Sequence, residues 1–156
     1  MLRKKSVLII GGTGLIGQML VRACLEHGAK VLCGVRQPDP ELFADLPSDQ
    51  LRRLTYQAVD VTDPQAVDNL FTSIKDEDSI LDAVVNCSFP RGSGFGAKFE
   101  DVLYSNFREN VTKHLGSAFL VCQSAAKYFS EVGSGNIINI SSIYSFLGYF
   151  FEVFLL

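Results

Sequence analysis

A glycine-rich turn between an apolar run and a helix is the feature that most constrains how this chain folds. The stretch is SVLIIGGTGLIG, residues 6–17, and its glycines follow the apolar run at three-residue spacing: Gly11, Gly14 and Gly17. An apolar run without polar alternation is typical of a strand buried on both faces of a parallel sheet. The helix that begins near Leu15 directs unpaired N–H groups and the positive end of its dipole toward the turn, and this suits a pyrophosphate.

Each glycine of the turn has a separate expected role. Gly11 permits the tight turn, Gly14 the close approach of a phosphate, and Gly17 the packing of the helix against the sheet. The alternative is a plain strand-to-helix turn without a ligand. On the first interpretation, the expected dinucleotide contacts in this stretch are Gly11, Thr13, Gly14, Leu15, Ile16 and Gly17.

Four more β-type segments follow and alternate with helical segments. Parallel strands need such intervening crossovers, so we expect an α/β fold, a Rossmann-type doubly wound parallel sheet of five strands. At 156 residues the chain is one domain by length. The expected strands are 7–10, 31–35, 55–61, 81–85 and 136–140, and the main helices are 15–27, 64–75 and about 101 or 105 to 131.

Two connecting segments carry weaker patterns. In the proline- and aspartate-rich segment after the second strand, Leu42, Phe43 and Leu46 are spaced as one short amphipathic turn on the surface. Residues 89–99 contain three glycines in five residues with no helix directly behind them. This favours a mobile loop over a second phosphate cradle. In an enzyme, this loop and Arg91 would face the substrate side.

The longest helical pattern ends at Glu131. Its apolar residues recur at helical spacing, so the helix should line the sheet. The stripe consists of Phe107, Val111, Leu115, Ala118, Phe119, Cys122, Ala126 and Phe129. His114 lies beside the stripe, where a histidine is by default a packed or surface residue. The acidic run 76–78, after the preceding helix, indicates a solvated helix end.

Polar residues follow several strands at the expected carboxyl edge, where ligands bind in parallel sheets. Arg36 follows the second strand at the place where an NAD-preferring chain carries an acid, and a guanidinium there can hold the extra phosphate of NADP. The alternative for Arg36 is an ordinary surface position. Asp60 can accept from an adenine amino group or provide only loop polarity. Asn86 can brace the sheet edge beside a cofactor or satisfy local backbone groups.

Composition argues against several other classes of protein. A net charge of −3 without a basic patch argues against nucleic-acid binding. The four cysteines lie far apart without a C-x-x-C pair. They therefore indicate neither a metal site nor a disulfide framework, and they fit a cytoplasmic protein. The apolar run after the basic start is too short for a signal peptide, and no stretch reaches the roughly 18 apolar residues of a membrane helix.

These segments resemble the short-chain dehydrogenase/reductase family from Ser6 to about Gly148. The run IGGTGLIG is similar to the family's T-G-x-x-G-x-x-G variant, with Ile10 in place of threonine. VDVTD is similar to the stretch that contacts adenine, and the resemblance implies that role for Asp60 and Val61. The implied fold is the family's, with five of its seven strands.

Two further segments carry the resemblance. VVNCSF is similar to V-N-N-A-G, retaining Asn86, with Cys87, Ser88 and Phe89 where the family has asparagine, alanine and glycine. The resemblance implies cofactor contacts for Asn86, Cys87 and Ser88. GNIINISS is the strongest match, and it implies that Ser142 is the catalytic serine that hydrogen-bonds the reacting carbonyl or hydroxyl.

The family's helix commonly carries N-x-x-G-x-F before this serine. Here HLGSAF places His114 where the catalytic asparagine stands, while Asn110 is one turn too early. The asparagine holds a helix kink and a water relay, which a histidine could also serve. The segments NCSFPRGSGFG, ENVTKHLGSAFL and NIINISSIYSFLG are closer to a bacterial branch found with nonulosonic-acid and flagellin-glycan synthesis. A sugar or sugar nucleotide is then the implied substrate class.

The family's general acid/base is a tyrosine with a lysine four residues later. After the serine pair, this sequence has Tyr144 and Tyr149, followed at that spacing by Gly148 and Val153. A tyrosine with a pKa near 10 transfers protons poorly at neutral pH without a neighbouring cation. The resemblance therefore implies a truncated member with impaired activity. The apolar segment 149–156 is atypical of the family and is an expected association site.

We therefore expect residues 1–148 to form an incomplete dinucleotide-binding domain, followed by the atypical tail 149–156. The implied activity is hydride transfer between NADP(H), with NAD possible, and a small carbonyl or alcohol substrate. A homo-oligomer is also possible. The alternative is a non-catalytic dinucleotide-binding fragment or an inactive truncated product.

Overall fold

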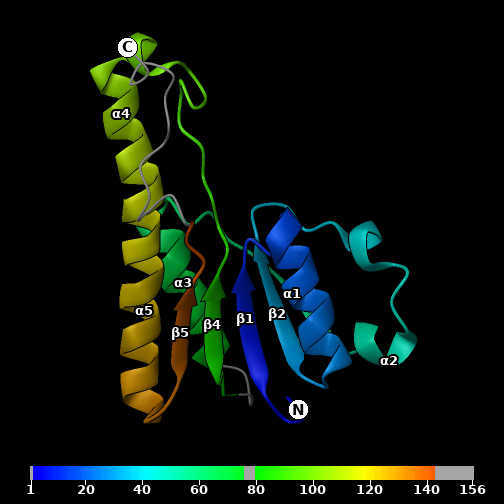
Figure 1. Ribbon diagram of the computed structural model, residues 1–156. Coiled ribbons are helices and arrows are strands. Elements are labelled where there is room, and N and C mark those ends of the chain that lie inside the picture. The colour runs from blue at the N-terminus through cyan, green and yellow to red at the C-terminus, as the bar shows by residue number, and fades with distance from the viewer. Residues whose placement is uncertain (1, 76–79, 143–156) are drawn as a thin grey trace.

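The computed structural model describes residues 2–75 and 80–142 (Figure 1). The predictions for the acidic run 76–78, for Tyr144 and Tyr149 and for the tail 149–156 lie outside the described residues. The strands are β1 (Ser6–Ile10), β2 (Lys30–Val35), β3 (Leu54–Ala58), β4 (Ala83–Asn86) and β5 (Asn136–Asn139). The helices are α1 (Leu15–Glu26), α2 (Ser48–Leu51), α3 (Pro64–Lys75), α4 (Tyr104–Val111) and α5 (Ser117–Val132), with 3-10 turns at Pro40–Phe43 and Phe99–Asp101 and a π turn at Thr112–Gly116.

The five strands form one parallel sheet in the order β3-β2-β1-β4-β5, with β1 at its centre (Figure 1). Ile10 pairs with Gly34 of β2 and with Asn86 of β4. The carboxyl ends of these three strands therefore meet at one edge. The fold predicted from the alternation of strands and helices, a doubly wound α/β sheet, is confirmed.

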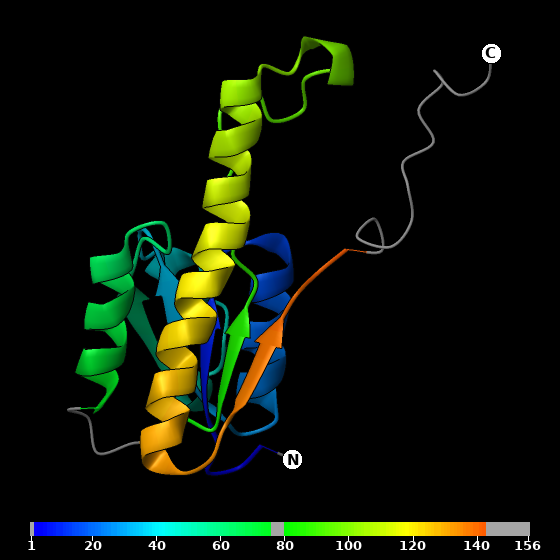
Figure 2. The same ribbon diagram turned by 90° about the vertical axis from the view of Figure 1, so that its left-hand side faces the viewer.

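Helices cover both faces of the sheet, and β1 packs against both layers. Leu8 and Ile10 belong to the core beneath α3 and α5, while Val7 and Ile9 belong to the core beneath α1. Figure 2 shows these two layers on opposite sides of the sheet. Burial of every residue of β1 explains the absence of polar alternation in its sequence.

Two expectations about short segments need correction. Phe43, predicted to lie in a surface turn, is fully buried in the core on the α1 side of the sheet, with the Arg22 guanidinium over its ring. β3 ends at Ala58 rather than at Val61, although Val59 and Val61 remain buried in the core. No helix in the described ranges combines the length and the apolar character needed to cross a bilayer.

The prediction that the apolar stripe of the long helix lines the sheet is wrong for most of its members. Phe107, Leu115 and Phe119 are each more than half exposed. Only Phe129 of the predicted stripe is buried, and α5 meets the core through Ser117, Val121, Ser124, Ala125, Tyr128 and Phe129. Figure 2 gives the reason, because α4 and the start of α5 extend beyond the carboxyl edge, where no strand lies beneath them.

Candidate functional site

The glycine turn after β1 is packed so closely that two of its positions admit no side chain. Gly11 has φ +77°, and a Cβ there would lie 2.9 Å from the Cys87 carbonyl carbon. A Cβ on Gly17 would lie 2.1 Å from the Gly11 carbonyl oxygen, so α1 starts directly against the turn. The expected tight turn and close helix packing are therefore both present. The helix contact at Gly17 is with the turn itself.

Helix α1 begins at this turn without a side-chain cap. Gly14 is its N-cap residue, no side chain caps its N-terminus, and its first turn contains no acid. Its first N–H groups have no intrahelical acceptor, and the positive end of the dipole lies there. Gln18 supports the turn through a hydrogen bond that its Nε2 donates to the Thr13 carbonyl oxygen at 2.8 Å. These features fit the phosphates of a dinucleotide.

A cavity of about 540 Å³ brings three predicted residues together: it is lined by Thr13, Arg36, Gln37 and Asp60. Thr13 comes from the glycine turn, Arg36 and Gln37 directly follow β2, and Asp60 follows β3. Sequence reasoning missed Gln37. Its position next to Arg36 at the end of a strand was the available signal.

Asp60 is an ionised acceptor in this cavity. Its Oδ1 accepts hydrogen bonds from the Thr62 backbone N–H at 2.9 Å and from the Thr62 hydroxyl at 2.7 Å. These bonds are the main cause that lowers the pKa of Asp60, and the positive charges of Arg36 and Lys113 lower it further. The neighbouring Val61 side chain is in the core, so a ligand contact from Val61 would come from its backbone.

Asn86 lies at the carboxyl end of β4 in a network of side chains. Its Oδ1 accepts from the Ser88 hydroxyl at 2.6 Å and from the Ser88 backbone N–H at 3.1 Å. Its Nδ2 donates to Oδ1 of Asn139 at 3.3 Å, and Asn139 donates to the Cys122 Sγ at 3.2 Å. Asn86 therefore satisfies a local backbone group and also ties β4 to β5, and its place beside a cofactor stays a prediction. Sequence reasoning missed Asn139.

Cys87 connects this network to the glycine turn. Its N–H donates to the Ile10 carbonyl oxygen at 2.8 Å, and its own carbonyl group packs against Gly11. Ser142 lies beyond the end of β5 and is exposed. Pairing between β4 and β5 continues through the Ile140 N–H, which donates to the Asn86 carbonyl oxygen at 3.0 Å.

His114 lies in the π turn between α4 and α5. Its ring centroid is 4.2 Å from that of Phe89 and 6.3 Å from that of Phe95. Its Nε2 is buried, and within the described residues it has no hydrogen-bond partner. The helix irregularity expected at this place is present, since π turns interrupt a helix locally and often mark functional sites.

Asn110, one turn before His114, holds the loop that follows β4. Its Oδ1 accepts from the Gly92 N–H at 3.1 Å, and its Nδ2 donates to the Ser93 carbonyl oxygen at 3.1 Å. Glu109 accepts from the Ser93 N–H at 2.9 Å. These bonds tie the segment to α4, and the mobility expected for it stays a prediction.

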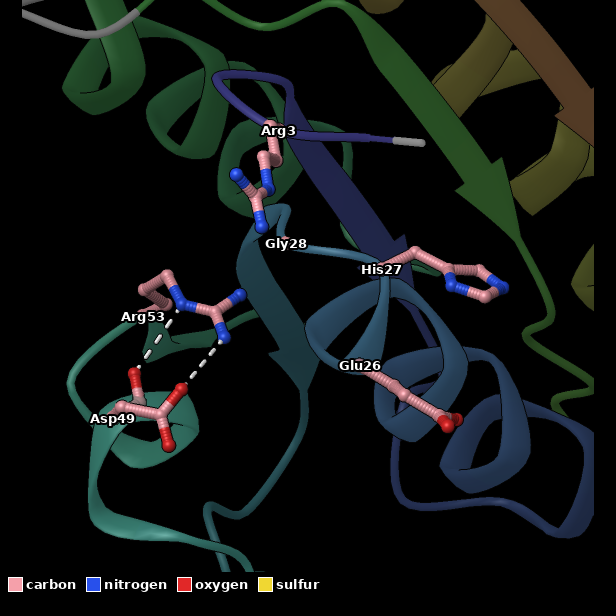
Figure 3. Close-up of a pocket in the computed structure, with 6 residues that line it drawn as sticks. All are labelled: Arg3, Glu26, His27, Gly28, Asp49 and Arg53. Atoms are coloured by element: carbon pink, nitrogen blue, oxygen red, sulfur yellow. Dashed lines mark hydrogen bonds and ion pairs between the residues drawn. The ribbon is translucent and has the colours of Figure 1, made fainter.

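A second cavity, of about 400 Å³, lies at the opposite, amino edge of the sheet (Figure 3). It is lined by Arg3, Glu26, His27, Gly28, Asp49 and Arg53. Arg53 Nη1 donates to the Leu25 and Ala29 carbonyl oxygens at 2.7 and 2.8 Å, and its Nη2 pairs with Asp49. Figure 3 shows that pair, with the side chains of Glu26 and His27 directed away from it. This cavity contains no predicted site residue.

Comparison with known proteins finds a family model and relatives that cover most of the chain. Residues 5–153 match the family model described as short chain dehydrogenase. Post-translational flagellin modification protein A of Campylobacter coli is 27% identical over 146 residues, covering 92% of this chain and 57% of that protein. The 3alpha-hydroxysteroid dehydrogenase of Mediterraneibacter gnavus is 30% identical over 155 residues, covering 95% of this chain and 59% of that protein.

Solved structures show the same arrangement of elements. ElxO with NADP bound superimposes with a TM-score of 0.79 at 25% identity, covering 93% of this chain and 58% of that one. A short chain dehydrogenase from Leptospira borgpetersenii with bound NAD+ gives a TM-score of 0.80 at 27% identity, covering 97% and 56%. The chain thus spans less than two thirds of the length of these relatives.

Proposed function

This chain belongs to the short chain dehydrogenase family, and from that premise we propose that it binds NADP(H) at the carboxyl edge of its sheet. We further propose that it takes part in hydride transfer between that cofactor and a carbonyl or alcohol. The observation that carries the proposal is the uncapped start of α1 at the glycine turn, beside a cavity lined by Arg36. The domain that binds the cofactor is residues 1–148.

Each part of the edge has a role in this proposal. The backbone N–H groups of residues 11–17 hold the two linked phosphates, and Arg36 with Gln37 holds the additional phosphate of NADP. Asp60 accepts from the adenine amino group. When bound, the nicotinamide ring supplies or accepts the hydride. The residues that follow β4 complete the cofactor edge: Asn86, Cys87 and Ser88.

The substrate side is formed by Ser142 and His114. The Ser142 hydroxyl donates a hydrogen bond to the reacting oxygen. His114 replaces the family's asparagine in the π turn beside the edge, where its Nε2 is buried without a hydrogen-bond partner among the described residues. Within residues 1–156 no tyrosine is followed by a lysine four positions later. Proton transfer by this stretch is therefore expected to be slow.

The proposed substrate is a small molecule, and a sugar or sugar nucleotide is the proposed class. That class comes from the resemblance of the sequence to a bacterial branch found with flagellin-glycan synthesis, and one relative is a post-translational flagellin modification protein. The related structures with bound NADP and NAD+ support a nicotinamide dinucleotide, and Arg36 favours the phosphorylated form. The charge of −3 and the scattered basic residues fit a small-molecule partner better than nucleic acid.

Turnover and binding assays on the purified 156-residue chain separate this proposal from a non-catalytic dinucleotide-binding fragment. Titration calorimetry should show one NADP+ bound per chain, and NADPH absorbance should fall slowly with at least one member of a panel of sugar and other carbonyl compounds. Binding without turnover on the whole panel would support the non-catalytic fragment. Absence of binding would contradict both.

We also propose that the exposed stripe on α4 and α5 associates with a second copy of the chain. Leu115 and Phe119 are 68% and 59% exposed, and contiguous apolar surface of this kind marks interfaces. A two-fold axis would bring identical stripes together. Sedimentation velocity should show a dimer that Phe119→Glu dissociates and that Lys127→Glu, an exposed change on the same helix, leaves intact.

A further inference from the structure

The loop after β4 presents two aromatic rings to solvent in a fixed arrangement. Phe89 and Phe95 are 56% and 49% exposed, although their ring centroids lie 5.5 Å apart in an edge-to-face contact at 81°. Large rings normally lose more of their surface when they pack into a core. Half of this apolar surface therefore remains available to a ligand.

The exposure of these rings does not come from a loosely attached loop. The backbone of Gly92 and Ser93 is bonded to Asn110 and Glu109 on α4, as described above. Glu109 is itself fixed by Lys113, whose Nζ lies 2.7 Å from Oε1. Both partners of the loop thus belong to one helical segment, and the rings are presented on a preorganised surface, which reduces the entropic cost of binding.

Arg91 adds a cation to this surface. Its guanidinium carbon lies 5.1 Å from the centroid of the Phe95 ring, and its side chain is exposed. Arg91 takes part in none of the ion pairs found among residues 2–75 and 80–142. The acid that contacts the loop, Glu109, is already engaged by Lys113 and Ser93. A planar guanidinium held on a ring keeps its fork of N–H donors for an oxyanion.

The His114 ring lies against the rings of Phe89 and Phe95. Its ring packs on Phe89 at 4.2 Å, and its Nε2 is buried without a hydrogen-bond partner in the described part of the chain. Phe89 lies three residues beyond Asn86, at the carboxyl end of β4. The cluster therefore adjoins the edge to which the proposed function assigns the cofactor.

We propose that Phe89, Arg91 and Phe95 form a recognition surface for an anionic ligand that carries a flat ring or C–H face next to its charge. The rings receive the flat face, and the Arg91 guanidinium pairs with a carboxylate or a phosphate. Calling this ligand the substrate rests on the proposed function. The recognition of a ring-bearing anion does not rest on the proposed function, because it depends on the loop and α4 alone.

Matched small probes test the chemistry of this surface. Benzoate and phenyl phosphate each join a ring to an oxyanion, and benzamide has the shape of benzoate without its charge. In amide NMR titrations of the full 156-residue chain, benzoate or phenyl phosphate should shift the signals of residues 91–95. Benzamide should bind about tenfold or more weakly, since a charge-assisted pair is lost. The stronger of the two anions identifies carboxylate or phosphate as the preferred group. Equal binding of benzamide and the anions would overturn the proposal.

Substitutions test which side chains bind the anionic probes. Arg91→Gln should weaken anion binding about tenfold, whereas Lys98→Gln, which removes the same charge from an exposed position of the same loop, should leave it unchanged. Phe95→Leu should weaken benzoate while the Gly92 and Ser93 amide signals stay in place, which shows that the loop is still attached. Equal losses of affinity in the Arg91 and Lys98 variants would show that anion binding depends only on the overall charge of the loop. This result would contradict the proposal.

A parallel titration with NADP+ keeps the two proposals apart. If benzoate binds at residues 91–95 and NADP+ shifts no amide of the glycine turn, the recognition surface stands and the proposed function fails. If NADP+ binds and no anionic probe does, the proposed function stands and the recognition surface fails.

Discussion

At the scale of single residues, the site depends on charge at the end of β2 and on missing side chains at the end of β1. Arg36 shares a cavity with Asp60, whose carboxylate carries the opposite charge and whose pKa is lowered in part by that guanidinium. Gly11 and Gly17 allow the turn to pack closely, because any Cβ there would collide with main-chain atoms. These two features set the predictions for cofactor choice and for stability.

Arg36→Asp tests cofactor choice. The variant should lose at least about tenfold in affinity for NADP+, because it removes a charge-assisted bond to phosphate and adds a repelling charge. Its affinity for NAD+ should change little. Calorimetric titration with both dinucleotides measures the difference, and Arg52→Asp, the same reversal at another exposed position, is the control. Equal losses for the two dinucleotides would remove Arg36 from the phosphate role.

Gly17→Ala tests the close packing of the turn. A Cβ at this position would lie 2.1 Å from the Gly11 carbonyl oxygen, so we expect the free energy of unfolding to fall by about 1–3 kcal/mol or more. The matched control is Gly116→Ala, whose Cβ would find its nearest neighbour, the Thr112 side chain, at 3.9 Å. Urea unfolding curves compare the two. A stability unchanged by Gly17→Ala would show that the turn is more open than described.

At the scale of elements, the long helix is interrupted and the loop after β4 is bound to its first part. The π turn at Thr112–Gly116 separates α5, which covers the sheet, from α4, which extends beyond the edge (Figure 2). The loop after β4 is bound to α4 through Asn110 and Glu109. Loop and helix therefore form one unit beside the candidate site.

The attachment of the loop should depend on pH through Glu109. Hydrogen bonds from Lys113 and from Ser93 lower the pKa of Glu109 from 4.5 to about 2. A lowered pKa in the folded chain means that the contact is complete above about pH 4.5 and is lost as the pH falls toward 2. The Ser93 amide signal should titrate with a midpoint near 2, and Glu109→Gln should abolish that titration. A midpoint near 4.5 would contradict the pairing.

The apolar pattern of the long helix shows where sequence reasoning reached its limit. Periodicity predicted an apolar face correctly but not which neighbour covers it, because that depends on how far the helix extends beyond the sheet. The buried face of α5 instead consists of Val121, Ala125, Tyr128 and Phe129 together with Ser117 and Ser124, and Ser124 donates to Asp68 of α3 at 3.0 Å. Phe43 is the reverse case, since it belongs to a short turn after β2 and is nevertheless buried in the core on the α1 side of the sheet.

At the scale of the whole molecule, the parallel sheet, its central strand and the meeting of the strands' carboxyl ends were predictable, whereas the full order of the strands comes from the structure. Alternation of β-type and helical segments fixes a parallel sheet, and the buried run before Gly11 identifies its central strand. The cavity lined by Thr13, Arg36 and Asp60 follows from that topology. Gln37 could have been selected from its position next to Arg36, whereas Asn139 could not, because its bonds to Asn86 and Cys122 depend on side-chain directions that spacing does not give.

The central claim is that the carboxyl edge of this sheet, and not its amino edge, binds a dinucleotide. The most direct test is an amide NMR titration of the 156-residue chain with NADP+. We expect shifts of the amide signals of residues 11–17 and of Arg36 and Gln37, with one NADP+ bound per chain. Absence of shifts there, or shifts confined to the cavity between Arg3 and Arg53 in Figure 3, would contradict it.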